Sequence, residues 1–150
     1  MAKLINDVSF AGSSITIAGG LGTIKITDFM DDANPVEFQD CEVSAVGINC
    51  NGHMIRYAKP SAIMMSVTVI PNSDNDKDLY NMWKKFRIKD DWSDDWEQAL
   101  SATIDVSNKS LNISRTLNGG TMVSGPGGPS SNGEGKLQGR TYTFAFAKPD

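Results

Sequence analysis

The fold class is decided by one stretch of the chain, residues 59–89, which reads KPSAIMMSVTVIPNSDNDKDLYNMWKKFRIK. Its first part, residues 62–70, is apolar at nearly every position and ends at Pro71. Such a run is typical of a strand covered on both faces, either at the centre of a sheet or partly by another subunit. After Pro71 the spacing of apolar residues changes, so the stretch predicts one buried strand followed by one helix.

The predicted helix covers residues 76–88. Large apolar side chains recur there at positions i, i+3, i+4 and i+7, so they form one stripe along the helix. The stripe consists of Leu79, Met82, Trp83 and Phe86. Acidic residues occupy the first turn and basic residues the last, which complements the helix dipole. We expect the stripe to pack on the core, with the helix flanking it.

The rest of the chain is patterned as short strands separated by glycine and asparagine turns. Residues 14–17 and 23–27 alternate apolar and polar side chains, as half-buried strands do. Further strands are expected at residues 102–106, 111–114 and 117–123, with a break at Gly119-Gly120.

The chain closes with a strand at residues 140–147, whose aromatic side chains alternate with smaller ones and form an inner face. These aromatic residues are Tyr142, Phe144 and Phe146. With about seven or more strands and one helix, we predict a mainly β fold, a β-barrel or β-sandwich with the helix at its flank. A chain of 150 residues is most simply one domain covering residues 1–150.

Two more segments have a clear local signature. Asn51-Gly52 is a strong hairpin signal, because a type I′ turn requires positive φ at both central residues. It predicts a long hairpin over residues 36–59, with a bulge at Gly47. Residues 124–136 are rich in glycine, proline and serine, so they cannot bury a core and are expected to form a mobile loop.

The sequence contains no constellation that indicates a catalytic, cofactor or metal site. His53 is the single histidine, and no nucleophile and carboxylate are grouped around it as a hydrolytic triad requires. The spacing of Cys41, Cys50 and His53 matches no zinc motif. We therefore expect no cofactor and no enzymatic activity, and we expect His53 to face solvent on the hairpin.

Three aspartates have the alternate spacing of the first ligands in a calcium-binding loop, namely Asp74, Asp76 and Asp78. The glycine and glutamate that such a loop needs at its sixth and twelfth positions are replaced by Leu79 and Lys85. Capping of the helix N-terminus explains the same aspartates, so a calcium site is not expected.

The bulk composition excludes several other classes of protein. The net charge of −4 and the scattered basic residues disfavour a module that grips phosphate backbones. The longest apolar run is far shorter than the ~20 residues of a spanning helix, so no membrane anchoring is expected. Residues 1–7 lack the apolar region of a signal peptide, which favours two free, partly buried thiols at Cys41 and Cys50 over a disulfide.

Several of these parts suit an assembling protein, because exposed strand edges and flexible arms pair with neighbouring chains. Their order resembles that of tail tube proteins of contractile-tailed bacteriophages. The resemblance rests on Val8-Ser9-Phe10 before a glycine-rich turn, the hairpin, Lys59-Pro60-Ser61 before the apolar strand, Ser73 and Asp74 before the single helix, and the closing strand Tyr142-Thr143-Phe144-Ala145-Phe146. The acidic insert at residues 90–97 and the glycine-rich loop have no counterpart in that family.

The resemblance implies a barrel that forms homo-hexameric rings, which stack into a hollow tube within the phage tail. The chain would be made in the cytoplasm of the host bacterium and would end in the virion. It would contact tail sheath and baseplate proteins, and DNA would pass through the lumen without specific binding. An acidic chain suits such a lumen, because like charges repel. The candidate inter-subunit contacts are Asn51, Gly52, Met64, Gly127 and Gly128.

Other classes of function remain open. A baseplate, tail-terminator or secretion-tube-like protein would form rings that do not stack. A β-sandwich binding module would hold a carbohydrate or another ligand with Trp92 and Trp96 of the acidic insert. Carboxylate catalysis by that insert is disfavoured, because a solvated acidic loop explains the same residues.

Overall fold

The computed structural model describes residues 12–19, 22–30, 34–87, 100–107, 112–131 and 135–149. Ten strands and one helix are found in this part of the chain. In chain order they are β1 (Ser14–Gly19), β2 (Gly22–Ile26), β3 (Val36–Phe38), β4 (Ser44–Ile48), β5 (Met54–Ala58), β6 (Ile63–Val69), α1 (Asp74–Arg87), β7 (Leu100–Ser107), β8 (Asn112–Ser124), β9 (Arg140–Phe146) and β10 (Lys148–Pro149). Two segments named from the sequence lie outside the described residues, Val8-Ser9-Phe10 and the acidic insert with Trp92 and Trp96.

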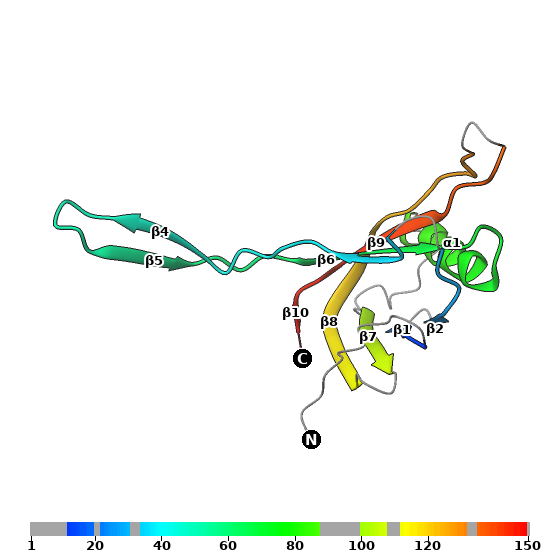
Figure 1. Ribbon diagram of the computed structural model, residues 1–150, viewed down its shortest axis with the longest axis horizontal. Helices are drawn as coiled ribbons and strands as arrows, with labels where there is room; N and C mark the ends of the chain where they lie inside the picture. The colour runs from blue at the N-terminus through cyan, green and yellow to red at the C-terminus, as the bar shows by residue number, and fades with distance from the viewer. Residues whose placement is uncertain are drawn as a thin grey trace, which may run out of the picture.

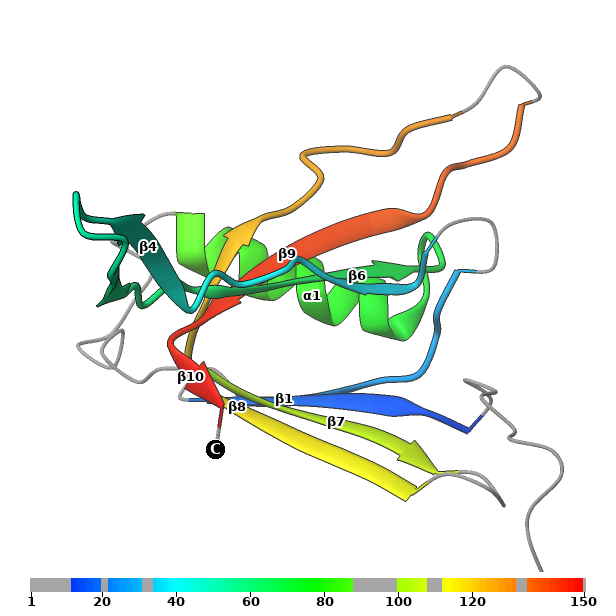
Figure 2. The ribbon, with the colours of Figure 1, turned by 60° about the vertical axis from the view of Figure 1, so that its left-hand side comes forward.

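Eight of the strands form one antiparallel sheet, in the order β2-β1-β7-β8-β9-β6-β3, with β10 also paired to β8. This sheet folds over into two layers, because β8 is 13 residues long and pairs with β7 in its first part and with β9 in its last. Figure 2 shows β1, β7 and the first part of β8 in one layer, and β6 and β9 in the other. The mainly β prediction with one helix is confirmed. Of its two architectures the sandwich fits, because β2 and β3 end the sheet and the described strands close no barrel.

The break predicted at Gly119-Gly120 is wrong, because β8 bends there without ending. The strand instead continues through both glycines, and its register with β7 shifts between Leu100 and Ala102. A Cβ at Gly120 would lie 2.4 Å from two ring carbons of Phe146 and 3.0 Å from the Leu100 carbonyl oxygen. The glycine is therefore needed where β8 passes from one layer to the other and the backbone comes close to an aromatic ring.

The core lies between the two layers and is closed at one side by α1. From the helix stripe Leu79 and Met82 are buried, and from β9 all three aromatic residues, Tyr142, Phe144 and Phe146, are buried. Trp83 and Phe86 are half-buried and pack against this cluster. The remaining core is aliphatic and comes from β1, β2, β6, β7 and β8.

The strand expected at residues 62–70 is β6, which lies between β9 and β3 in the sheet. Met65, Val67 and Val69 point into the core and are fully buried. On the opposite face Met64 and Ser66 are half-buried. The expectation of cover on both faces therefore holds fully for the inner face and only in part for the outer one.

The helix begins at Asp74, two residues before the predicted start, because Ser73 caps it. The Ser73 Oγ accepts a hydrogen bond of 3.2 Å from the Asp76 backbone N–H and donates one of 2.8 Å to the Ile70 carbonyl oxygen. This is the geometry of an N-cap residue bonded to the third helical position. No helix among the described residues is long and apolar enough to cross a membrane.

Asn75 joins the start of the helix to the end of β2. Its buried side chain accepts hydrogen bonds from the backbone N–H groups of Thr27 (2.9 Å) and Asp28 (3.0 Å) and donates one to the Lys25 carbonyl oxygen (2.8 Å). From there the chain crosses to the end of β6, where the Met30 N–H donates to the Thr68 carbonyl oxygen. No local pattern in the sequence predicts this link.

The predicted hairpin at residues 36–59 is present but is part of a longer ribbon. β4 pairs with β5, whereas β3 pairs with β6, so both chains of the hairpin continue into the main sheet. The turn is a three-residue loop, not type I′: of its residues only Gly52 has positive φ, at 79°, and the Gly52 N–H donates to the Asn49 carbonyl oxygen. The bulge expected at Gly47 is absent, because the β4–β5 register is regular.

Candidate assembly interface

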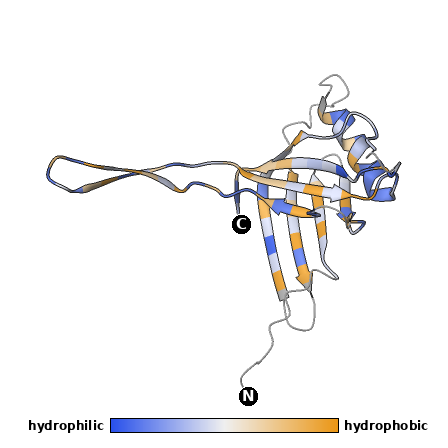
Figure 3. Cartoon of the chain, turned by 45° about the horizontal axis from the view of Figure 1, so that its top comes forward, coloured by the Kyte–Doolittle hydropathy of each residue, from blue (hydrophilic) through white to orange (hydrophobic). Residues whose placement is uncertain are grey.

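The most unusual surface of the molecule is a two-stranded arm, residues 43–58, which contains β4, β5 and their turn. It projects from the body of the protein along the longest axis of the molecule (Figure 1). Hydrophobic residues occur along the arm (Figure 3), and among them Val46, Ile48 and Met54 are 63%, 72% and 68% exposed. Exposed apolar patches of this kind mark interaction sites in soluble proteins.

The register of β4 and β5 distributes these side chains over both faces of the arm. Residues directly opposite each other in an antiparallel pair share a face. The first face therefore holds the pairs Val46–Arg56 and Ile48–Met54, and the second face holds Ala45–Tyr57 and Gly47–Ile55. On the second face Tyr57 is 61% and Ile55 42% exposed.

This two-sided pattern has an energetic consequence. A sheet with one face on a core usually carries polar side chains on the other face, but the arm carries exposed large apolar side chains on both. Burying one large apolar side chain contributes roughly 1.5–3 kcal/mol before the cost of association. The arm is therefore suited to burial between neighbouring chains on both of its faces.

The tip of the arm is preorganised by the side chain of Asn49, a residue that was not predicted to have a role. The Asn49 Oδ1 accepts hydrogen bonds of 3.0 Å from the backbone N–H groups of both Asn51 and His53. Asparagine at the start of a turn is the local signal for this arrangement. Asn51 and Gly52, two of the candidate contact residues, lie exposed at this tip, and so does His53.

The base of the arm is held by polar contacts between its two chains. Lys59 and Glu42 form an ion pair, and the Lys59 N–H donates to the Val43 carbonyl oxygen at 3.1 Å. The Ser61 hydroxyl donates to the Glu42 carbonyl oxygen at 3.2 Å. Both charged side chains are more than half exposed, so the ion pair itself adds little stability, and the backbone contacts keep the ribbon continuous.

The two cysteines lie at opposite ends of this ribbon, Cys41 near the base and Cys50 at the tip. Both thiols are free, as expected. Both are also exposed, so the expectation that they are partly buried is wrong. The reason is that they belong to the projecting ribbon and not to the body.

The remaining candidate contact residues lie elsewhere in the molecule. Met64 is half-buried on the outer face of β6. Gly127 and Gly128 are exposed in the loop between β8 and β9, which extends away from the sheet (Figure 2). The two sides of this loop meet where Ser131 bridges to Leu137. The candidate contacts are thus spread over three separate surfaces: the arm tip, the sheet and the loop.

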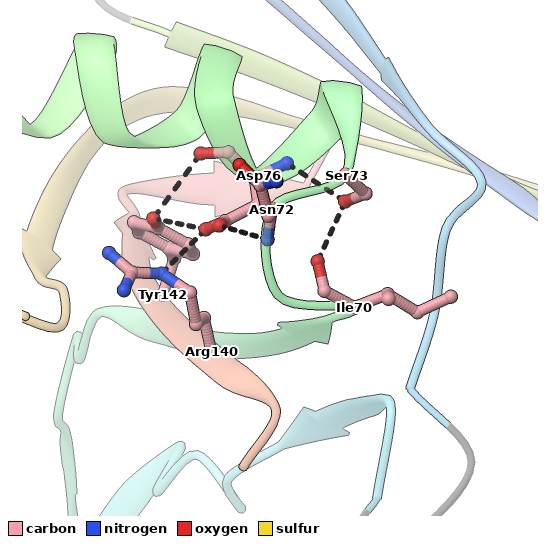
Figure 4. Close-up of polar contacts among 6 residues, drawn as sticks. All are labelled: Ile70, Asn72, Ser73, Asp76, Arg140 and Tyr142. Carbon is pink, nitrogen blue, oxygen red and sulfur yellow. Dashed lines mark hydrogen bonds and ion pairs between the residues drawn. The ribbon is translucent and has the colours of Figure 1, made fainter. Parts of the chain in front are cut away.

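A cluster of buried polar groups ties α1 to β9 (Figure 4). The Asp76 Oδ1 accepts a hydrogen bond of 2.8 Å from the Tyr142 hydroxyl and lies 2.7 Å from the Arg140 Nε. The Asp76 Oδ2 accepts a hydrogen bond of 2.9 Å from the Asn72 N–H. The Arg140 Nε–H meets Asp76 as an ion pair without hydrogen-bond geometry.

The electrostatics of this cluster are those of a structural clamp. Burial, supported by the bond to Asp76, raises the pKa of Tyr142 to about 12. Burial lowers the pKa of the Arg140 guanidinium, but the interactions with Tyr142 and Asp76 raise it by more. The pKa therefore lies above its ordinary value. From the sequence, Asp76 was expected only to stabilise the N-terminus of the helix. No local pattern predicts its contacts with Arg140 and Tyr142, which are distant in the sequence.

Within the described residues no group of three or more His, Cys, Asp or Glu side chains is placed to hold a metal ion. The best-defined candidate for function is the arm, whose exposed apolar side chains are typical of an interaction surface.

Comparison with solved structures finds the same fold in contractile injection systems. A chain from the cryo-EM structure of an extracellular contractile injection system, the PVC sheath/tube terminator in its extended state, aligns with a TM-score of 0.62 and 12% identity over 99% of this chain and 98% of that one. A chain from the six-fold symmetrised baseplate of the anti-feeding prophage (AFP) aligns with a TM-score of 0.61 and 13% identity over 100% and 96%.

Comparison of the sequence gives the family. No curated protein matches the chain. The sequence model of one family, described as tail fiber protein gp32, matches residues 6–150. Because this match spans nearly the whole sequence, the chain belongs to the tail fiber protein gp32 family and is a phage-tail-like protein.

Proposed function

We propose that the protein is a structural subunit of a contractile phage tail that assembles with copies of itself into homo-hexameric rings, which stack as a tail tube around a lumen for DNA. The observation that carries the proposal is the arm, whose apolar side chains are exposed on both faces. An isolated soluble domain gains nothing from such an arm, whereas a subunit of a tube buries it against its neighbours.

The geometry of the arm favours a ring over a symmetric dimer. The arm projects from one end of the body (Figure 1), so a contact between the arm and the body of a neighbour joins two different surfaces. Contacts between different surfaces generate closed rings or open helical filaments. A stack of rings contains both kinds of contact, within a ring and between rings.

The proposed role has consequences for partners and chemistry. Such a subunit acts by assembly and not as an enzyme, and it meets the tail sheath and the baseplate at the outside and end of the tube. It resides in the virion. A net charge of −4 supports a lumen through which DNA moves without binding, since like charges repel.

Electron microscopy of the purified full-length protein tests the proposal. We expect rings and tubes in negative stain, with the proportion of tubes rising with protein concentration. Met54→Lys, which places a charge on the first face of the arm, should shift the protein towards smaller assemblies by light scattering, while circular dichroism shows that it is folded. Val123→Lys is the matched control, because Val123 is 53% exposed on β8 outside the arm. A wild-type protein that remains monomeric at every concentration would contradict the proposal.

A ring that does not stack, as in a baseplate or tail terminator, is the second candidate. The observation in its favour is that both structural relatives come from structures titled as a sheath/tube terminator and a baseplate. The same micrographs separate the two candidates, because a terminator or baseplate subunit gives single rings at every concentration.

A further inference from the structure

The body of the protein has an apolar cavity of about 220 Å³ between the two layers of the sandwich. A larger cavity of about 540 Å³ lies beside it. Ile63 and Pro149 border both cavities. We call the smaller cavity with its apolar walls the interlayer groove. Its apolar walls are Phe38, Ile63, Ile104, Leu117 and Pro149.

The interlayer groove is open to a partner. Phe38, on its border, is 44% exposed, and β3, which carries Phe38, is the last strand at its end of the sheet. An apolar groove beside a strand edge accepts a β-ribbon from another chain. The arm of the same molecule points away from the body (Figures 1 and 3), so the ribbon must come from elsewhere.

We propose that the interlayer groove receives the second face of the arm from a second copy of this chain, an inference that rests on the proposed self-assembly. The second face is a ridge, because the large side chains of Ile55 and Tyr57 stand opposite the small residues Gly47 and Ala45. A ridge of this kind inserts into a groove, whereas an evenly filled face lies flat on a surface.

The charged side chains at the groove and on the arm favour insertion of the second face over the first. Arg115, which is exposed, borders the interlayer groove. The first face carries Arg56 beside Val46, so its insertion would bring two guanidinium groups together in a site that excludes water, which is unfavourable. The second face, made of the pairs Ala45–Tyr57 and Gly47–Ile55, carries no charged side chain. Its Tyr57 ring can lie against the Arg115 guanidinium as a cation–π pair.

The proposed contact is head-to-tail. Each copy inserts its arm into one neighbour and accepts the arm of another, which is the arrangement that closes into a ring or continues as a helix. The first face of the inserted arm stays available for a third copy. The apolar side chains on both faces are thus accounted for by two different neighbours.

Cross-linking of the full-length chain tests the pairing of these surfaces. In a background of Cys41→Ser and Cys50→Ser, Thr116→Cys at the groove is combined either with Ala45→Cys on the second face or with Val46→Cys on the first. The two arm positions are adjacent and both exposed, so they differ mainly in face. We expect a short bis-maleimide to produce a ladder of covalent oligomers with Ala45→Cys and at least fivefold less with Val46→Cys.

A substitution in the groove adds a second readout. Phe38→Asp should abolish assembly, whereas Ile70→Asp should leave it unchanged, because Ile70 is equally exposed at 44% but lies outside the groove. Assembly that survives Phe38→Asp, or cross-linking that favours Val46→Cys, would overturn the groove contact while leaving the proposed function intact. A wild-type chain that never assembles would overturn both proposals.

Discussion

Tyr142 and Asp76 are joined by a hydrogen bond of 2.8 Å across 66 positions of the sequence, with the hydroxyl donating to the carboxylate. The tyrosine is fully buried and the aspartate nearly so. This contact, together with the ion pair between Asp76 and Arg140, attaches the first turn of α1 to the start of β9. The body that carries the arm and contains the interlayer groove therefore has its helix held by a buried polar clamp.

The first prediction concerns the strength of this clamp. Tyr142→Phe should lower the free energy of unfolding by about 1–2 kcal/mol, because it removes a buried hydrogen bond and leaves the carboxylate oxygen less satisfied. Tyr57→Phe on the exposed arm is the matched control and should stay within about 0.5 kcal/mol of wild type. Urea denaturation followed by circular dichroism measures both values. Equal stability of all three proteins would show that the hydrogen bond between Tyr142 and Asp76 contributes nothing.

The second prediction follows from the pKa of Tyr142. Its value of about 12 in the folded protein lies above the ordinary value of 10.0, so the folded state retains the phenolic proton longer than the unfolded chain. The stabilisation is present below pH 10 and is lost as the pH rises towards 12. Wild type should therefore lose stability more steeply over this range than Tyr142→Phe in parallel urea titrations. Parallel curves would exclude the linkage.

The third prediction concerns Asn75, whose side chain makes three hydrogen bonds to the backbone around the end of β2. Asn75→Ala should cost about 2–3 kcal/mol, because buried backbone groups lose their partners. Asn81→Ala on the exposed face of the same helix should be neutral or slightly stabilising, since alanine favours helix. Thermal melting measures the stability of both variants. A difference in unfolding free energy below about 0.5 kcal/mol would contradict a stabilising role of the Asn75 hydrogen bonds.

The fourth prediction concerns the bend of β8. Gly120→Ala should cost about 1–3 kcal/mol or more, because its Cβ would overlap the Phe146 ring in a packed core. Gly127→Ala is the control, since a Cβ there meets no atom within 4 Å. Denaturation midpoints of the two variants should differ clearly. A Gly120→Ala protein as stable as the control would mean that the bend tolerates a side chain.

The parts of the fold that the sequence predicted are those with local periodicity. The apolar run of β6 and the stripe of α1 follow from the spacing of side chains, and so does the aromatic face of β9. The Asn51-Gly52 pair correctly marked a hairpin. It did not specify the turn, because an Asn-Gly pair fits a type I′ turn and also a three-residue loop with glycine in the left-handed region.

The features that could not be predicted depend on contacts between distant residues. Gly119-Gly120 suggested a break because no local rule states that Phe146 approaches the strand there. The partners of Asp76 lie on β9, far along the chain. The two faces of the arm could be assigned only when the β4–β5 register was known, and the interlayer groove combines residues from five strands.

The last prediction uses the head-to-tail character of the proposed contact. Tyr57→Asp should disable the arm and leave the groove intact, whereas Phe38→Asp should disable the groove and leave the arm intact. Each variant alone should be monomeric. When they are mixed, one working arm meets one working groove, and no further copy can add through this contact because the remaining arm and the remaining groove are both defective. We therefore expect a 1:1 dimer by light scattering.

A matched mixture makes this complementation specific. Tyr57→Asp mixed with Ile55→Asp combines two defective arms with two intact grooves, so it should remain monomeric at the same concentrations. A symmetric contact between two arms predicts the opposite pattern, because the groove variant alone would then still dimerise. Contacts between different surfaces allow restoration only by complementary partners, so the mixed species distinguishes an arm-to-groove contact from an arm-to-arm contact.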